Sequence, residues 1–429
     1  MSRSFRFLVA MLPPAAAVIV ACGPARSGTG DPETLADATH LEGPSAGPSA
    51  SARADGSKPA PAEAALSGLR VVERTNPPRT HVVDANGALV ASFTRAARTV
   101  VVYGRTRTLR EREVAFPTAD LPPLGADDGD GSSSPTRTYV APPVTTTAWV
   151  RVLTQPYEGT MTDAHWAWLR ERRDDTSDDV LAIAYRFTTG GPKDAAYGPL
   201  TSTSSASDPS RVTVGRKEGA DWNDYLGIAH TYADGTVDKP NLGTVSADGG
   251  AGTPSLVGSL DCSGFIRMVW GHELGRDRVE LLPPLKEAST STPSCRKYVT
   301  PPAGFAGRGL PRRAVQMFDF GAGIVLQPNR GTLPEPARAA VIERLQPGDI
   351  VFFDADPDDN CDRSASVIDH VGIYLGQDDG DPTRGGRPRP RFISSRKTVN
   401  GPTTHDVGGP SALDGDTHFG RGFVAARRF

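Results

Sequence analysis

Residues 261–270 read Asp-Cys-Ser-Gly-Phe-Ile-Arg-Met-Val-Trp, an apolar pattern of helical period that begins at a cysteine. We expect a helix whose first residue is Cys262. The unpaired N–H groups and the positive end of the helix dipole favour the thiolate form of a thiol at this place. The same N–H groups could stabilise an oxyanion formed by attack on a carbonyl. A buried structural cysteine is the alternative interpretation.

A second pattern lies further along the chain. A polar turn leads into the apolar run 350–353, and another apolar run, 371–375, begins directly after His370. Turn, strand, loop and strand in this order predict two antiparallel strands, with His370 at the start of the second. A histidine there, opposite a helix-borne cysteine, could act as a general base and imidazolium partner. A structural histidine is the alternative. Further strands are expected at 391–394 and 422–426.

Three motifs therefore follow one another in a fixed order. They are Asp261-Cys262-Ser263-Gly264-Phe265, Pro347-Gly348-Asp349 before the run 351–353, and His370-Val371-Gly372-Ile373-Tyr374. This order resembles the NlpC-type family of bacterial cell-wall cysteine peptidases, and the resemblance covers about 211–429. It implies an α+β fold of papain-like type, in which the helix bearing the cysteine packs on an antiparallel sheet. It also implies that Cys262 attacks a carbonyl and that His370 activates it.

The resemblance implies a substrate as well. Members of the family cleave amide bonds in peptidoglycan stem peptides, typically beside γ-linked D-glutamate. We therefore predict a cysteine peptidase that needs no cofactor. Peptide binding is expected at Trp222 and Tyr225, which precede the cysteine, and at Asp261 and Ser263 beside it. Packing in the core is the alternative for the two aromatic residues, and helix capping is the alternative for Asp261.

One departure from the family concerns the residue that orients the catalytic imidazole. In the family this third polar residue is commonly a histidine, and the matching position here is Ser394. A hydroxyl can accept the imidazole N–H, but it does not offset the charge of the ring. Ser394 therefore orients His370 more weakly, or a carboxylate such as Asp369 or Asp406 takes this role.

A second departure is the spacing of the two predicted catalytic residues. His370 follows Cys262 by 108 residues, which is long for this fold and predicts an insertion at 276–345. Short helices are expected within it, near 311–318 and 336–345. We expect the insertion to border the cleft and to narrow the choice of substrate.

The N-terminus resembles a bacterial lipoprotein signal. Arg3 and Arg6 precede an apolar stretch that is too short to span a bilayer and ends directly before Cys22. The resemblance implies removal of residues 1–21 and acylation of the Cys22 thiol, whereas an ordinary secretory signal is the alternative. Residues 22–65, rich in Pro, Ala, Ser and Gly, predict a flexible tether. We therefore expect an extracytoplasmic protein that a lipid anchors to the membrane.

Export changes the interpretation of the remaining cysteines, because disulfides persist outside the cytoplasm. If Cys22 carries a lipid and Cys262 is the nucleophile, Cys295 and Cys361 remain as a disulfide pair. Two unpaired thiols are the alternative.

Residues 66–205 predict a small α+β domain in front of a peptidase domain at 206–429. Asn86-Gly87 is a hairpin-turn signal between apolar runs. A passage rich in Gly, Ser and Pro at 189–210 marks the boundary. Strand-like runs lie at 69–72, 88–93, 98–103 and 146–153, and helical patterns at 161–174 and 177–187. The residues of this region do not indicate its role.

Composition argues against several classes of function. The 47 Lys and Arg residues are balanced by 50 Asp and Glu residues, so the excess positive charge that a nucleic-acid binder uses is missing. The 8 His and 4 Cys residues show no metal-ligand spacing, and no glycine-rich phosphate loop is found.

We expect a monomer that acts on peptidoglycan peptides. A non-catalytic binding or regulatory module and an acyltransferase using the same thiol remain as alternatives.

Overall fold

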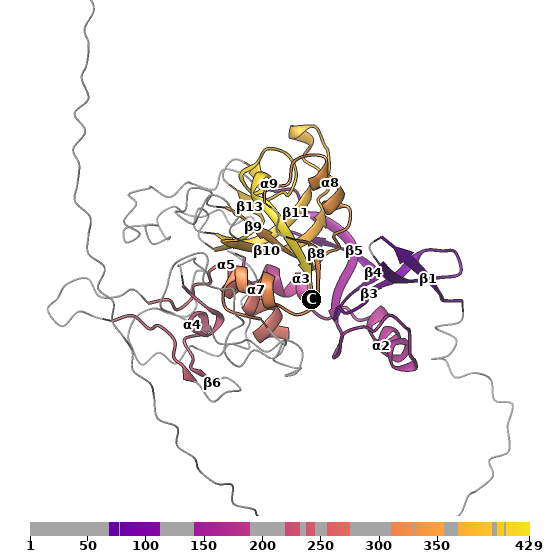
Figure 1. Ribbon diagram of the computed structural model, residues 1–429, viewed down its shortest axis with the longest axis horizontal. Coiled ribbons are helices and arrows are strands. Elements are labelled where there is room, and N and C mark those ends of the chain that lie inside the picture. The colour runs from indigo at the N-terminus through magenta and orange to yellow at the C-terminus, as the bar shows by residue number, and fades with distance from the viewer. Residues whose placement is uncertain are drawn as a thin grey trace, which may run out of the picture. The chain divides into compact units, whose positions relative to one another are not determined.

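The computed structural model of the protein describes residues 68–76, 78–111, 141–188, 219–231, 237–244, 255–274, 310–328, 331–355, 368–396, 401–406 and 409–429. These residues belong to one compact unit, Pro59–Phe429, of mixed α+β structure with antiparallel sheets (Figure 1). The predicted signal and tether, with Cys22, lie outside the described residues, as do Cys295 and Cys361. The predicted boundary at 189–210 and residues 276–309 of the predicted insertion also lie outside them.

The first sheet is an antiparallel meander with the strand order β1-β2-β3-β4-β5. Its strands are β1 (Arg70–Thr75), β2 (Pro78–Val83), β3 (Leu89–Thr94), β4 (Thr99–Leu109) and β5 (Val144–Val152). The predicted turn at Asn86-Gly87 is confirmed, because it joins β2 to β3, with Val83 paired to Leu89. Gly87 has a φ of 83°, a conformation that residues with a side chain rarely adopt.

Two predicted helices of this region are present and are capped by polar side chains. Helix α2 (Asp163–Arg173) begins after Thr162, and α3 (Val180–Arg186) begins after Asp179. The Asp179 carboxylate accepts from the backbone N–H of Val150 at 2.6 Å and pairs with Arg107 at 2.6 Å. Asp179 therefore fixes the start of α3 against β4 and β5.

The second sheet has the strand order β12-β11-β10-β9-β15-β8, and the pairs are antiparallel. Its strands are β8 (Ile324–Gln327), β9 (Ile350–Phe353), β10 (His370–Gln377), β11 (Pro390–Arg396), β12 (Gly401–Thr403) and β15 (Phe423–Arg428). The predicted strands at 350–353, 371–375, 391–394 and 422–426 are thus confirmed. His370 opens β10, as expected, and is paired with Phe353.

Short elements surround the second sheet. The helices are α4 (Trp222–Leu226), α5 (Cys262–Ile266), the π-helix η2 (Arg267–Glu273), α7 (Ala314–Phe320), α8 (Ala337–Ile342), the 3-10 helix η3 (Pro382–Arg384) and α9 (His418–Gly422). The short strands pair as β6 (His230–Thr231) with β7 (Val237–Asp238), and β13 (His405–Asp406) with β14 (Gly409–Pro410). In the described stretches, no helix is long and apolar enough to cross a membrane.

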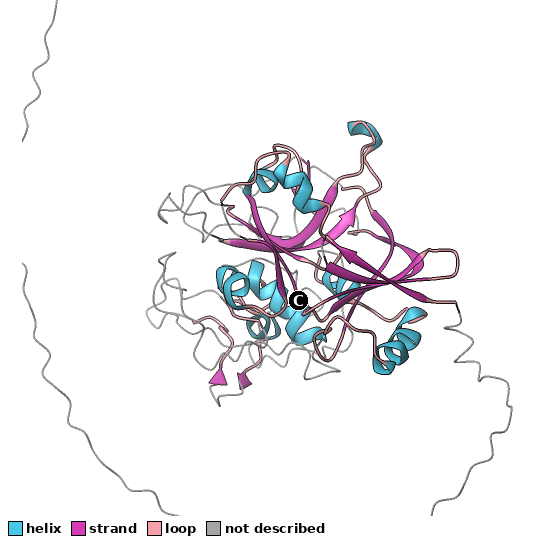
Figure 2. Cartoon of the chain, turned by 45° about the vertical axis from the view of Figure 1, so that its right-hand side comes forward, coloured by secondary structure: helices cyan, strands magenta, loops and turns pink. Residues whose placement is uncertain are grey.

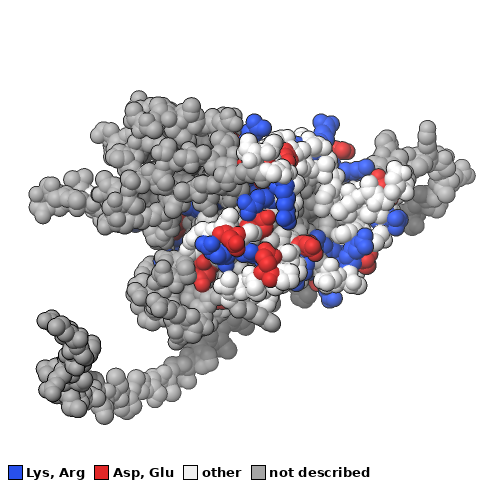
Figure 3. All heavy atoms as spheres, turned by 90° about the horizontal axis from the view of Figure 1, so that it is seen from above, with Lys and Arg blue, Asp and Glu red and all other residues white. Residues whose placement is uncertain are grey.

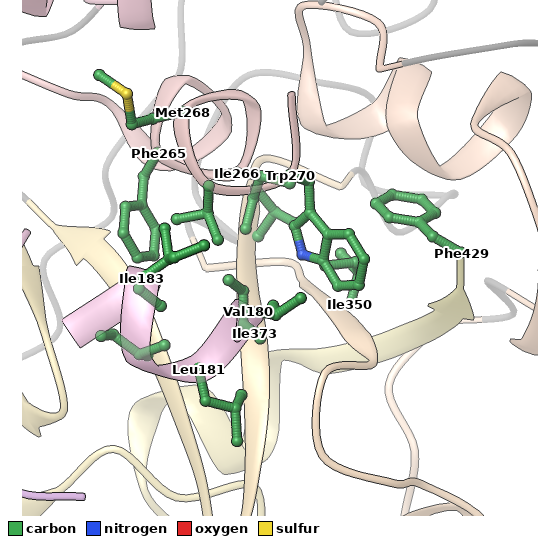
Figure 4. Packing of buried hydrophobic residues seen from close by; sticks show 14 of the residues in the cluster. Val180, Leu181, Ile183, Phe265, Ile266, Met268, Trp270, Ile350, Ile373 and Phe429 are labelled. Carbon is green, nitrogen blue, oxygen red and sulfur yellow. The ribbon is translucent and has the colours of Figure 1, made fainter. Parts of the chain in front are cut away.

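Helices cover both faces of the second sheet (Figure 2). Alternate residues of a strand point to opposite faces, so Ile350 and Phe352 pack with α5 and η2, whereas Val351 and Phe353 pack with α8 and α9. The core on the α5 face includes residues of the first sheet. It also continues into α3, whose apolar side chains lie near those of α5 in Figure 4. Residues that were expected in two domains therefore share one core.

The turn before β9 shows how closely the two sheets pack. Gly348 has a φ of 92°, and a Cβ at this position would lie 2.5 Å from Val150 Cγ1 on β5. Only glycine fits here without a shift of either sheet. The Pro-Gly-Asp motif is thus a contact between the two regions of the chain as well as the start of a strand.

Candidate active site

Cys262 is the first residue of α5, which packs against β10 and β11. Its N-cap is Asp261, whose side chain accepts from the backbone N–H of Gly264 at 2.6 Å. The cysteine is 5% exposed, and its thiol donates to the backbone carbonyl of Asp369 at 3.8 Å, next to His370 in the chain. The sulfur therefore lies beside the first residue of β10.

Gly264 allows the helix to approach α4 closely. A Cβ at Gly264 would clash with the backbone carbonyl of Ala220 and would lie 3.0 Å from Asp221 Cα. The backbone N–H of Asp261 donates to the same carbonyl at 2.9 Å. The glycine of the Cys-Ser-Gly motif is thus required by packing at the start of the helix.

Buried arginines compensate the carboxylates beneath α5. Arg312 donates to Asp261 at 2.6 Å and 3.1 Å and to Ser263 Oγ at 2.7 Å. Arg267 of η2 pairs with Asp221 at 2.9 Å and donates to the backbone carbonyl of Leu310. The helix-capping role of Asp261 is confirmed, and peptide binding by Asp261 and Ser263 stays a prediction.

The ring of His370 packs against two phenylalanines that also contact each other, with its centre 5.8 Å from that of Phe353 and 5.2 Å from that of Phe419. It is 7% exposed, and its Nε2 lies 3.0 Å from Ser394 Oγ on β11. Nε2 is thus the ring nitrogen that faces Ser394.

The two carboxylates considered as alternatives to Ser394 lie in the loops around the site. Asp369 Oδ1 accepts from the backbone N–H of Ala355 at 2.8 Å, which ties the end of the β9 segment to the start of β10. Asp406 lies in β13, and its side chain is outside the described residues. Ser394 contacts the His370 ring directly through its hydroxyl.

The two predicted peptide-binding aromatics lie on α4. Trp222 is buried, stacks on His272 at 4.6 Å and meets His230 edge-on at 4.8 Å. Tyr225 is partly buried, with its ring 5.6 Å from that of Phe187, and burial raises the pKa of its hydroxyl to about 12. Both rings pack in the core cluster, as the alternative interpretation expects. Peptide binding by either residue stays a prediction.

Sequence reasoning missed the charged residues behind the site. Arg312 follows the long segment after the cysteine, and Arg396 ends β11. The sequence could have predicted the position of Arg396, because the two-residue period of a strand places it on the same face of β11 as Phe392 and Ser394. Glu111, two residues after the end of β4, contacts the 403–405 segment, and no local pattern in the sequence predicts this contact.

Acidic and basic side chains are mixed over the face of the molecule seen in Figure 3. Among the described residues, no group of three His, Cys, Asp or Glu side chains is arranged to hold a metal ion.

The chain matches no family model, no curated protein and no solved structure.

Proposed function

We propose that the protein is a lipid-anchored, extracytoplasmic cysteine peptidase of papain-like type, which hydrolyses amide bonds in peptidoglycan stem peptides. The observation that carries the proposal is the meeting of α5 and β10. The Cys262 thiol bonds to the backbone carbonyl of Asp369, and the adjacent His370 has Nε2 held by Ser394. Packing of α5 on β10 and β11 supports the papain-like arrangement.

The proposed reaction proceeds through a thioester. His370 takes the proton of the Cys262 thiol, and the sulfur attacks the amide carbonyl. The oxyanion accepts hydrogen bonds from N–H groups at the start of α5. The C–N bond then breaks, and His370 returns the proton to the leaving amine. Water, deprotonated by His370, hydrolyses the thioester and frees the thiol.

The substrate class and the location rest on the sequence. The three ordered motifs support a peptidoglycan stem peptide as the substrate, with cleavage beside γ-D-glutamate. The apolar segment before Cys22 supports export and acylation. Cys295 and Cys361 would then form a disulfide in the oxidising compartment.

The first experiment measures alkylation of the exported, full-length chain by iodoacetamide across pH. Cys262→Ser identifies the labelled thiol, and His370→Ala removes the base. His418→Ala is the matched control, because this exposed histidine lies on α9 next to Phe419. We expect Cys262 to react well below pH 8. The rate should fall at least tenfold in His370→Ala and stay unchanged in His418→Ala.

The second experiment incubates the protein with soluble muropeptides and identifies products by mass spectrometry. Hydrolysis adds one water to each cleaved bond, whereas acyl transfer joins the acyl group to an added amine. An unactivated thiol together with intact muropeptides would overturn the proposal and leave a non-catalytic binding module. Reactive Cys262 with transfer products only would replace hydrolysis by acyl transfer.

A further inference from the structure

We propose that Arg396 is a positioning residue for His370, and that Glu111 holds Arg396 in place. The inference deepens the proposed function and rests on it. It gives the region before residue 189 a role, because Glu111 lies two residues after the end of β4 in the first sheet. Neither residue touches the reacting atoms in this scheme, and both act through Ser394.

The first step of the argument is the contact between Arg396 and Ser394. Arg396 is 2% exposed, and its Nε donates to Ser394 Oγ at 2.9 Å. The same oxygen lies 3.0 Å from His370 Nε2. A hydroxyl has two lone pairs and one proton, so Arg396 occupies one lone pair and leaves the rest for the imidazole. If Ser394 rotated away, it would leave a buried N–H of Arg396 without this acceptor.

The second step is the way in which the guanidinium is itself fixed. Nη1 donates to the backbone carbonyl of His405 at 2.6 Å, and Nη2 donates to that of Thr403 at 3.2 Å and to Ser411 Oγ. The guanidinium carbon lies 4.6 Å from the centre of the Phe419 ring, which also contacts His370. The planar fork therefore has one orientation in which its hydrogen bonds form together.

The third step is the support of the 403–405 segment by Glu111. The buried carboxylate of Glu111 accepts from the backbone N–H of Thr404 at 2.8 Å and from the hydroxyls of Thr403 and Thr404. It also lies 2.8 Å from His405 Nδ1. The carbonyls of Thr403 and His405, which accept from Arg396, belong to this segment. Glu111, two residues beyond β4, is thus connected through this segment, Arg396 and Ser394 to the ring of His370.

The burial of these groups makes the arrangement stiff. A buried charged group costs free energy unless its hydrogen bonds are satisfied, so small displacements are opposed. A catalytic group displaced by about 1 Å loses on the order of 100-fold in rate. Arg396 and Glu111 therefore act on the rate of the reaction and not on peptide affinity.

The test compares Arg396→Lys with Arg427→Lys in the full-length protein. Lysine keeps the charge but not the planar fork. Arg427 of β15 is a matched control, because it is also buried and donates to the backbone carbonyls of Phe318, Gly321 and Ala322. Glu111→Gln is a second variant that leaves both arginines intact. Each variant is checked by its Tm, by the NMR shifts of the His370 ring nitrogens and by kcat and KM on muropeptides.

We expect Arg396→Lys to shift the His370 ring nitrogens and to lower kcat about 10- to 100-fold, with KM within about twofold. Glu111→Gln should shift the same signals by less. Arg427→Lys should lower the Tm and leave the ring signals and kcat unchanged. Wild-type ring signals in folded Arg396→Lys and Glu111→Gln would overturn the inference, as would equal effects in Arg427→Lys. If the wild type cleaves no muropeptide, the proposed function fails, while the ring signals still test the positioning.

Discussion

Arg428 and Asp349 form a fully buried ion pair with two hydrogen bonds, Nε to Oδ1 and Nη2 to Oδ2, each 2.7 Å long. Arg428 Nη1 also donates to Thr94 Oγ1 at 2.7 Å, and Asp349 accepts from the backbone N–H of Gln346. The pair joins β15, the turn before β9 and β3. The aspartate of the Pro-Gly-Asp motif therefore has a structural role, because its ion pair with Arg428 holds these elements together.

Asp349→Ala should therefore lower the free energy of unfolding by about 3–5 kcal/mol, because it leaves the Arg428 charge buried without its partner. Asp416→Ala is the control: this exposed carboxylate lies in the loop before α9, and we expect a change within about 0.5 kcal/mol. Urea unfolding followed by circular dichroism measures both. Equal losses in the two variants would contradict this role for the pair.

Asp261 combines a helix cap with an ion pair, and two substitutions separate these contributions. Asp261→Asn keeps an acceptor for the Gly264 N–H but removes the charge that faces Arg312. Asp261→Ala removes both. We expect the alanine variant to be less stable than the asparagine variant by about 1 kcal/mol, the usual value of an N-cap. Denaturant midpoints measure the difference, and identical midpoints would show that the cap contributes nothing.

Gly264→Ala should lower stability by about 1–3 kcal/mol, because the added methyl group meets the backbone of Ala220. Gly104→Ala on β4 is the comparison, since a Cβ there meets its nearest neighbour, Arg173 O, in a tight contact of 3.3 Å, and we expect a smaller loss of stability. The Tm of both variants is measured by calorimetry. A Gly264→Ala protein as stable as the wild type would mean that α4 and α5 are further apart than the structure has them.

The pH dependence of stability should include a contribution from Asp175. Burial opposes its ionisation, but hydrogen bonds from Ser177 and Arg172 and the charge of Arg151 outweigh this effect and lower the pKa. A carboxyl whose pKa is lowered by folding stabilises the protein above its unfolded pKa of about 3.9, and this stability is lost at lower pH. Asp175→Asn should therefore cost about 1–2 kcal/mol at pH 7 and less as the pH falls below about 4. Unfolding curves from pH 7 to pH 2 measure the difference in the free energy of unfolding between the wild type and this variant. A difference that stays constant with pH would contradict this assignment.

Local patterns in the sequence predicted many of the helices and strands of this protein. The apolar alternation in 350–353 and 371–375 predicted β9 and β10, and the helical period after Cys262 predicted the start of α5. Strand β2 was missed because Pro78, Arg79 and His81 interrupt its apolar pattern, although Val82 and Val83 are buried in the sheet. The π-helical geometry of η2 was missed as well, since it arises from packing and not from residue type.

In the candidate site, the sequence determined which side chains begin the helix and the strand that meet there. It placed Cys262 at a helix start and His370 at a strand start. It also offered Ser394 as the partner of the imidazole; the two side chains lie 3.0 Å apart, and the orienting role stays a prediction. These predictions succeeded because helix starts and strand periods depend on residues that are neighbours in the chain.

Only the tertiary structure decided what surrounds these groups. Arg312 lies beneath the start of α5, and Arg428 pairs with Asp349 across the core. Glu111 and Arg396, far apart in the chain, meet around the 403–405 segment. A buried charge is stable only with a partner, and that partner can come from any distance along the chain. Local patterns determine the strands and helices, whereas the partners of buried charges depend on how these elements pack.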